Sequence, residues 1–246
     1  MAQNVYDNQD FFEAYAQLSR SVNGLNGAPE WPSIVKMLPE MEGLNIVDLG
    51  CGYGWFCHDA RQKGAKQVLG LDISERMLNK AREMTSDTAI IYRNEDLEQL
   101  KLPEATYDLV YSSLTLHYIE DLSTLLKTIY QSLTSGGHVV VSVEHPIYTA
   151  SKHPRWLIDE EGQKSWPVNS YQTEGRRITN WLTEGIIKQH RMIGTYLNLL
   201  IEQGFIIKHV EEWGPTLHQI AETPSLKEES ERPMILLVSA QKHTNK

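Results

Sequence analysis

Three alternate glycines are the residues best placed to bind a ligand. Gly50, Gly52 and Gly54 lie in the segment Val-Asp-Leu-Gly-Cys-Gly-Tyr-Gly-Trp, which covers residues 47–55. An apolar run leads into the glycines and a helix-like stretch follows them. Glycines in such a turn let the backbone approach a ligand closely and adopt φ values that other residues avoid. The pattern predicts a small-molecule site at the carboxyl end of a strand.

Two neighbours of the glycines indicate which ligand is expected. The spacing is close to the G-x-G-x-x-G motif of NAD and FAD sites, but Trp55 occupies the last position, which must be small in that motif. Asp48 lies just before the turn, where its carboxylate would face a pyrophosphate. An acidic group suits a ligand that carries an ammonium and a sulfonium. The turn therefore predicts S-adenosylmethionine and disfavours an NAD-dependent oxidoreductase.

A second acidic residue supports this interpretation. Asp72 ends the next apolar run, about twenty residues after the glycines, where a carboxylate can accept both ribose hydroxyls. The alternative is that Asp72 caps a helix expected to begin near Ser74. Because the glycine turn and this aspartate occur together, ribose binding is the favoured interpretation.

The elements that must position these residues alternate between strand-like and helix-like segments. Strands are expected at 44–49, 67–71, 89–92, 107–112, around Val140, 205–210 and 233–240. Helices are expected at 55–63, 74–84, 122–133 and 192–203. Apolar strands that alternate with amphipathic helices form a sheet covered on both faces. The fold predicted is α/β: a Rossmann-like, seven-stranded, mostly parallel sheet.

Two segments depart from this alternation. Residues 1–40 are expected to form an N-terminal helical cap, broken by Gly24, Gly27 and Pro29. Residues 146–189 are rich in Trp, Pro, Gly and charge and show no clear period. A connection of this length is usually functional, so we expect a lid-like insertion between strands five and six. The whole chain, 1–246, is expected to form a single domain.

Five segments then resemble a known family. Residues 47–55, 69–74, 95–97, 107–110 and 133–137 look like the successive motifs of class I S-adenosylmethionine-dependent methyltransferases, in order and spacing. Further segments are similar to a bacterial subgroup close to the ubiquinone/menaquinone-biosynthesis-like methyltransferases: 11–20, 144–148, 188–191, 196–200 and 204–205. The resemblance implies an enzyme that uses S-adenosylmethionine and releases S-adenosylhomocysteine.

The resemblance also implies roles for residues around the adenine. Asp96 would meet the adenine amino group, Leu97 would pack beside the ring, and Met77 would cover its other face. Ile73, which follows Asp72, is expected in the same site. Two alternatives stay open: a solvated carboxylate for Asp96 and plain helix core for Met77.

Other residues are expected at the methionine end of the cofactor. By analogy with the family, Tyr15 and Arg20 would reach the methionine carboxylate, and the alternative is a helix packed on the sheet with an exposed arginine. Ser112, at the end of the fourth strand, is also expected in the cofactor site. His117 is expected to line the site beside the methionine arm.

The sequence indicates the methyl acceptor mainly by disfavouring several classes of acceptor. The segment 111–114, Tyr-Ser-Ser-Leu, differs from the Asn/Asp-Pro-Pro-aromatic turn of adenine-amino and glutamine methyltransferases. Cys51 and Cys57, in the turn and the next helix, are poorly placed as nucleophiles for pyrimidine C5 methylation. The formal charge of -9 disfavours nucleic acid. A small-molecule oxygen, nitrogen or carbon acceptor is favoured; an RNA- or protein-modifying methyltransferase and a non-catalytic cofactor-binding protein are the alternatives.

Three histidines are candidate general bases, because imidazole titrates in the useful pH range, and His145 and His190 are favoured over His117. His145 follows the fifth strand beside Pro146, and His190 is expected to start the helix after the insertion. The alternative is that each is only a packing or surface residue. An acceptor that is acidic when bound requires no base.

The insertion carries aromatic and basic residues that favour an anionic or aromatic substrate: Trp156, Trp166, Tyr171, Trp181, Arg155, Arg176 and Arg177. A packed flap or a homodimer contact is the alternative.

The two cysteines exclude a disulfide framework, and no Cys/His set predicts a metal. The N-terminus lacks signal-peptide order and no apolar run reaches membrane-spanning length, so a cytoplasmic protein is expected.

Overall fold

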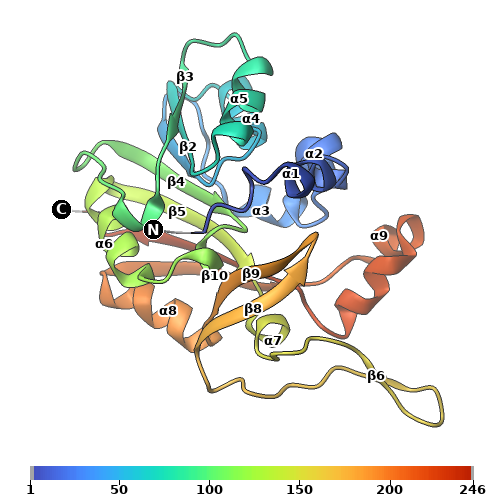
Figure 1. The fold of residues 1–246 in the computed structure, drawn as a ribbon. Coiled ribbons are helices and arrows are strands. Elements are labelled where there is room, and N and C mark those ends of the chain that lie inside the picture. The colour runs from blue at the N-terminus through green and yellow to red at the C-terminus, as the bar shows by residue number, and fades with distance from the viewer. Residues whose placement is uncertain (1–2, 245–246) are drawn as a thin grey trace.

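A seven-stranded sheet forms the centre of the protein in the computed structural model, which describes residues 3–244 (Figure 1). Its strand order is β10-β11-β5-β4-β1-β2-β3. The strands are β1 (Asn45–Leu49), β2 (Gln67–Asp72), β3 (Ile90–Asn94), β4 (Tyr107–Ser113), β5 (Leu133–Glu144), β10 (Phe205–Trp213) and β11 (Ile235–Lys242). The five strands from β1 to β5 are mutually parallel, whereas β11 is antiparallel to both of its neighbours. The predicted Rossmann-like, mostly parallel sheet is confirmed.

Helices cover both faces of the sheet. Helices α6 (Leu122–Ser132) and α8 (Ile193–Glu202) share one apolar core with Val47 and Leu49 of β1. Helices α3 (Trp31–Met37), α4 (Trp55–Gln62) and α5 (Glu75–Glu83) contribute to a second core with Ile46. Successive side chains of a strand point to opposite faces, so β1 carries apolar side chains on both faces, at Ile46, Val47 and Leu49. This two-sided burial explains why the strands were recognisable in the sequence.

The N-terminal segment is helical but interrupted, as expected. It forms α1 (Gln9–Tyr15), α2 (Ser19–Val22) and a 3₁₀ turn at Gly24–Gly27 before α3. The side chain of Asn8 caps α1 by accepting a hydrogen bond from the Phe11 amide. Gly24 has a φ of +59°, which ends α2 and turns the chain.

The insertion is more regular than its sequence indicates. After α7 (Pro146–Thr149) it forms two antiparallel hairpins, β6 (Leu157–Ile158) with β7 (Lys164–Ser165) and β8 (Gly175–Trp181) with β9 (Thr183–His190). These hairpins lie outside the main sheet. The strands β6 and β7 and most of β8 are exposed or half-buried, whereas β9 buries Ile186 and its last three residues, 188–190.

One boundary after the insertion differs from the sequence expectation. His190 does not start the next helix, because it pairs with Gly175 as the last residue of β9. That ladder holds the backbone of His190 extended, and α8 begins only at Ile193.

Short helices complete the fold. The connection from β10 to β11 contains α9 (Leu217–Glu222) and a 3₁₀ helix at Pro224–Ser230, and two further 3₁₀ turns occur at Leu97–Gln99 and Leu116–Tyr118. Within residues 3–244, no helix is both long enough and apolar enough to cross a membrane.

The N-terminal segment and the insertion meet above the carboxyl ends of the parallel strands. The rings of Phe11 and Tyr15 lie 5.7 Å and 6.3 Å from that of Trp181, at the tip of the β8–β9 hairpin. Gln3 also exchanges hydrogen bonds with the backbone of Gly185 and Ile187. Figure 1 shows the blue N-terminal helices beside the orange tip of this hairpin. The N-terminal segment and the β8–β9 hairpin, which are far apart in sequence, therefore together cover this end of the sheet. We refer to this cover as the roof.

Candidate active site

A cavity of about 270 Å³ lies under this roof, at the carboxyl ends of β1, β2, β4 and β5. We refer to it as the main cavity. Ten of the fifteen sequence-predicted site residues border it: Tyr15, Arg20, Gly50, Gly52, Asp72, Ile73, Met77, Asp96, Leu97 and His117. Five do not: Asp48, Gly54, Ser112, His145 and His190. The structure thus gathers most of the predicted residues around one space.

The glycine turn forms one wall of the main cavity, and its three glycines differ in what surrounds them. All have positive φ: +77° at Gly50, +52° at Gly52 and +74° at Gly54. A Cβ on Gly50 would collide with the Thr115 side chain, and one on Gly54 with the Tyr92 hydroxyl. A Cβ on Gly52 would meet no atom within 4 Å. Gly52 therefore faces open space, while its two neighbours fit the turn against the protein.

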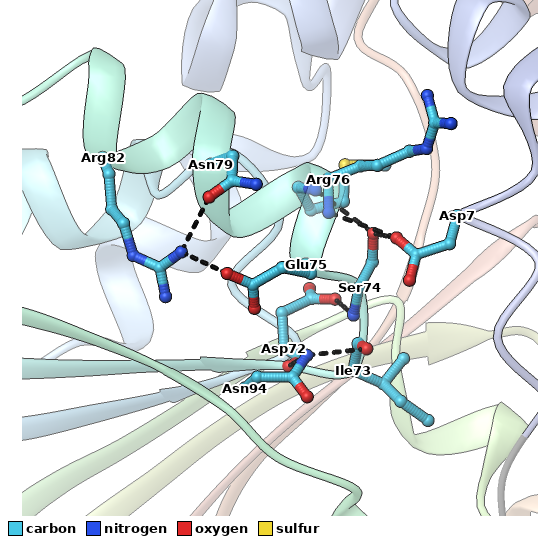
Figure 2. A network of polar contacts seen from close by, with 10 residues as sticks. Asp7, Asp72, Ile73, Ser74, Glu75, Arg76, Asn79, Arg82 and Asn94 are labelled. Atoms are coloured by element: carbon cyan, nitrogen blue, oxygen red, sulfur yellow. Dashed lines mark hydrogen bonds and ion pairs between the residues drawn. The ribbon is translucent and has the colours of Figure 1, made fainter.

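Asp72 joins the glycine turn to β2. Its Oδ2 accepts a hydrogen bond from the Gly52 amide at 2.9 Å, and its Oδ1 accepts one from the Ser74 amide at 2.9 Å. Figure 2 shows this carboxylate beside Ser74 and Ile73. Burial raises the pKa of Asp72 to about 6, although both amides oppose that shift. The helix α5 is capped by Ser74, whose Oγ accepts from the Met77 amide, so Asp72 is not the N-cap.

The residues expected around an adenine line the same end of the cavity. Met77 is buried in the first turn of α5, and the Ile73 carbonyl accepts from the Asn94 side chain. Asp96 caps the 3₁₀ turn that begins at Leu97, where its Oδ1 accepts from the Glu98 amide. Three apolar side chains and one carboxylate thus border this end: Ile73, Met77, Leu97 and Asp96.

The opposite end is aromatic and contains an ion pair. Tyr6, Tyr15, Tyr118 and Trp181 border it, and Tyr6 packs edge-on against Tyr15 and Tyr118. Arg20 forms a 3.0 Å ion pair with Glu30, whose side chain is fully buried. The Arg20 side chain is 28% exposed, so its guanidinium is held by a partner but still partly accessible.

Asp48 lies beneath the turn and borders a smaller side cavity of about 100 Å³. This side cavity shares Tyr15, Arg20, Gly50 and Gly52 with the main one. The thiol of Cys57 donates to Asp48 Oδ2 at 3.5 Å. Burial raises the pKa of Asp48 to about 8, so in this structure the carboxyl is largely protonated at neutral pH.

Gly54 and Ser112 border neither the main cavity nor the side cavity. Gly54 precedes α4 as its N-cap residue. Ser112 is fully buried and donates from Oγ to the Leu49 carbonyl at 2.8 Å. The next residue, Ser113, borders both cavities instead, because successive residues of β4 face opposite ways.

The histidines divide into one on the cavity wall and two away from it. His117 borders the main cavity, and its Nδ1 accepts from the Glu144 amide at 3.3 Å. Burial keeps the pKa of His117 well below the usual value, so the ring is neutral with its proton on Nε2.

His145 and His190 have both ring nitrogens engaged in the structure. His145 Nε2 lies 2.8 Å from Glu212 Oε1, and its Nδ1 accepts from the Ile147 amide. His190 contacts the Thr149 hydroxyl and the Tyr171 carbonyl, each at 2.8 Å. Burial lowers the pKa of both rings. In the structure as described, neither imidazole reaches the main cavity.

Solved structures decide the family. A Mesorhizobium loti S-adenosylmethionine-dependent methyltransferase is 55% identical, with a TM-score of 0.86, over 89% of this chain and 100% of its own. A structure from Listeria monocytogenes is 40% identical, with a TM-score of 0.81, over 88% and 99% of the two chains. Residues 47–141 also match the methyltransferase domain model. The chain belongs to the S-adenosylmethionine-dependent methyltransferases.

Curated relatives of this methyltransferase fall into two groups. An uncharacterized Haemophilus influenzae protein is 35% identical over 97% of both chains. The malonyl-[acyl-carrier protein] O-methyltransferase of Erwinia billingiae is 37% identical, but the match covers only 41% of this chain and 39% of that protein. The cofactor of this enzyme is therefore S-adenosylmethionine, while the full-length relative leaves the acceptor open.

An ion pair on the cavity wall was not predicted from the sequence. Glu144, the last residue of β5, lies 2.5 Å from Lys188 Nζ of β9, with side chains 16% and 4% exposed. Both border the main cavity. The second carboxylate oxygen, Glu144 Oε2, is buried and accepts no hydrogen bond from the described residues. Both residues lie in segments that resemble the bacterial subgroup, but nothing local to either one indicates the pairing.

The aromatic and basic residues of the insertion do not gather at one site. Trp181 borders the main cavity, and Tyr171 packs on His190. Trp156 and Trp166 instead pack around the Arg232 guanidinium, which lies 5.6 Å and 4.4 Å from their rings. The basic residues Arg155 and Arg177 border a groove that adjoins the main cavity, whereas Arg176 does not.

Proposed function

We propose that this methyltransferase acts on a small-molecule acceptor through oxygen, nitrogen or carbon. The observation that carries the proposal is the cover over the aromatic end of the main cavity, which we call the acceptor end. The ring of Trp181 packs against Phe11 and Tyr15, so the insertion and the N-terminal helices roof the main cavity together. A roofed, aromatic cavity suits a molecule that enters it whole better than a segment of RNA or protein.

The cofactor is proposed to extend along the main cavity from α5 to the glycine turn. Asp72 would accept the ribose hydroxyls beside Ile73, and Asp96, Leu97 and Met77 would surround the adenine. Tyr15, Arg20, Asp48, Gly50, Gly52 and His117 would surround the methionine end, with Gly54 and Ser112 in support. The position of Asp72, on the cavity wall and hydrogen-bonded to Gly52, supports this orientation.

The reaction is an in-line displacement at the methyl carbon. The acceptor lone pair forms the new bond, the carbon–sulfur bond breaks, and its electron pair stays on sulfur in S-adenosylhomocysteine. The protein's part is to align the two molecules and to exclude water. The roof over the cavity supports both tasks.

A protic acceptor must also lose a proton, and Glu144 is proposed to take it. Glu144 lies at the end of β5 on the cavity wall, and its buried Oε2 has no hydrogen-bond partner among the described residues. Lys188 neutralises the carboxylate in the free site. His145 and His190, the bases favoured by the sequence, are held away from the cavity by the contacts described above.

The insertion at 146–189 is proposed to act as a lid on a single domain, together with the N-terminal helices at 1–40. It contributes Tyr148, Trp181 and Lys188 to the cavity wall. Both cysteines are buried and unbridged, which supports a reducing, cytoplasmic location. A homodimer through the insertion stays a prediction.

A binding and labelling experiment tests the proposal. Thermal shifts are measured with S-adenosylmethionine, S-adenosylhomocysteine and NADH; at about a hundred times Kd a ligand adds roughly 2.7 kcal/mol of stability, or very roughly 5–10 °C. Methyl-labelled cofactor is then incubated with cell extract separated by size. We expect shifts with the two adenosyl ligands and label in the small-molecule fraction. Label in RNA or protein would support the alternative acceptors, and binding without any transfer would support a non-catalytic binder.

A further inference from the structure

A groove adjoins the acceptor end of the main cavity and opens beneath the insertion. It measures about 640 Å³ and shares Glu144, Tyr148, Trp181 and Lys188 with the main cavity. The two spaces therefore meet at the Glu144–Lys188 pair and at two aromatic rings. A molecule whose reacting group lies beside Glu144 has room for a second group in this groove.

The groove is basic in a protein that is acidic overall. Lys152, Arg155, Arg177 and Lys188 border it, and Glu144 is its only acidic residue among those the structure describes, whereas the whole chain carries a formal charge of -9. Because Lys188 already pairs with Glu144, the positive charge left over comes from the other three side chains. The groove therefore attracts anions locally.

The three remaining cations differ in what they can offer a ligand. The Arg177 guanidinium donates to the carbonyls of Ala150, Ser170 and Thr173, so it supplies charge and a rigid wall. Lys152 and Arg155 are exposed, and neither has a hydrogen bond or ion pair to another described residue. Their donors are available, and a guanidinium matches a carboxylate or phosphate in bidentate fashion.

We propose that this basic groove binds the anionic end of the methyl acceptor, a carboxylate or a phosphate. The acceptor is then an anionic small molecule whose methylated group lies at Glu144 and whose connecting part passes Tyr148 and Trp181. This inference rests on the proposed small-molecule function and specifies its substrate class. A second hollow borders the other side of Lys152 and Arg155 but shares no residue with the main cavity, so an anion there would not connect with the reacting group.

The test measures probe binding to protein saturated with S-adenosylhomocysteine. The probes are 4-hydroxyphenylacetate and its neutral amide, and 4-hydroxyphenyl phosphate with 4-hydroxybenzyl alcohol. We expect at least one anion to bind tenfold or more tightly than its neutral counterpart, and the carboxylate and phosphate arms show which group fits. The variant Lys152→Ala/Arg155→Ala should weaken that anion tenfold or more and leave the neutral probe unchanged.

A matched control separates the groove from general charge. Lys101→Ala/Lys127→Ala removes the same charge from two exposed lysines outside the groove and should leave the anion's affinity within twofold at 0.15 M salt, where distant charges are screened. Equal binding of anions and neutral probes, equal loss in both double variants, or no binding of either anion would each overturn the proposal. Failure of wild-type protein to bind S-adenosylhomocysteine would instead contradict the cofactor site on which the proposed function rests.

Discussion

The glycine-turn end of the main cavity and the groove beneath the insertion differ in charge and in origin. The first presents the carboxyl groups of Asp72, at the end of β2, and Asp96, shortly after β3, with Asp48 of β1 in the side cavity. The second presents Lys152, Arg155 and Arg177 on an insertion outside the sheet. Acidic groups suit a cationic cofactor, and basic groups suit an anionic acceptor. The contrast is the one expected if the cofactor and the proposed anionic acceptor bind at different ends.

The Glu144–Lys188 pair lies at the boundary between these regions. It belongs to both spaces and is nearly buried. A paired carboxylate and ammonium present little net charge, so neither reactant is repelled at the meeting point. The four predictions below alter the boundary first and then the cofactor end.

Removal of one partner of the boundary pair should give the largest effect. Lys188→Met leaves Glu144 without its counter-ion, and loss of one member of a buried pair costs about 3–5 kcal/mol. We expect the free energy of unfolding in urea to fall by about 3 kcal/mol, and Glu144→Gln/Lys188→Met to recover most of it. Lys63→Met, in the more exposed pair with Asp59, should cost less than about 1 kcal/mol. If the Glu144–Lys188 pair were no more than a surface contact, Lys188→Met and Lys63→Met would lower the free energy of unfolding by equal amounts.

Asp72→Ala tests the acidic end. Loss of two charge-assisted hydrogen bonds, on the order of 1.5–3 kcal/mol each, should weaken S-adenosylhomocysteine at least tenfold in calorimetry. Asp7→Ala is the matched control, because Asp7 accepts from the Ser74 hydroxyl in the same network but does not border the cavity (Figure 2). Unchanged affinity in Asp72→Ala would remove the ribose assignment.

Substitutions at two glycines distinguish an effect on cofactor binding from an effect on the stability of the fold. Gly52→Ala adds a methyl group that meets no protein atom, so it should cost about 1–2 kcal/mol of backbone strain and block cofactor binding. Gly50→Ala adds a collision with Thr115 and should destabilise the fold further. Urea unfolding and calorimetry measure both effects. Normal cofactor affinity in Gly52→Ala would show that the ligand does not approach the turn.

The smallest expected effect is a pH dependence at Asp72. Burial raises its pKa to about 6 from the ordinary 3.8, so the folded protein holds this proton more tightly than the unfolded chain. Its contribution to stability therefore falls as pH rises from about 4 to about 6. Below pH 6 the carboxyl is protonated and accepts ribose hydroxyls less well, so affinity for S-adenosylhomocysteine should decline up to tenfold per pH unit. Asp72→Asn should lack this decline. Identical pH profiles of affinity in the two proteins would show that another group causes the decline.

The cofactor half was largely predictable because its residues follow strands whose pattern is local in sequence. Gly50, Gly52 and Asp72, which end or follow apolar runs, border the main cavity. Ser112 does not border the cavity, because the alternation of β4 directs Ser113 to it instead. The candidate bases His145 and His190 lie close to the site in sequence terms, but their rings are held elsewhere by Glu212 and Thr149.

Strand periodicity, the glycine turn and the acidic residues after two strands were enough to establish the fold and the cofactor, because each depends on neighbours within a few residues. The acceptor end depended on the tertiary structure. Glu144 meets Lys188 only because β9 folds back over β5, and Trp181 meets Tyr15 only because the insertion reaches the N-terminal helices. Such contacts join residues far apart in the chain, and no local pattern in the sequence specifies which of them will pair.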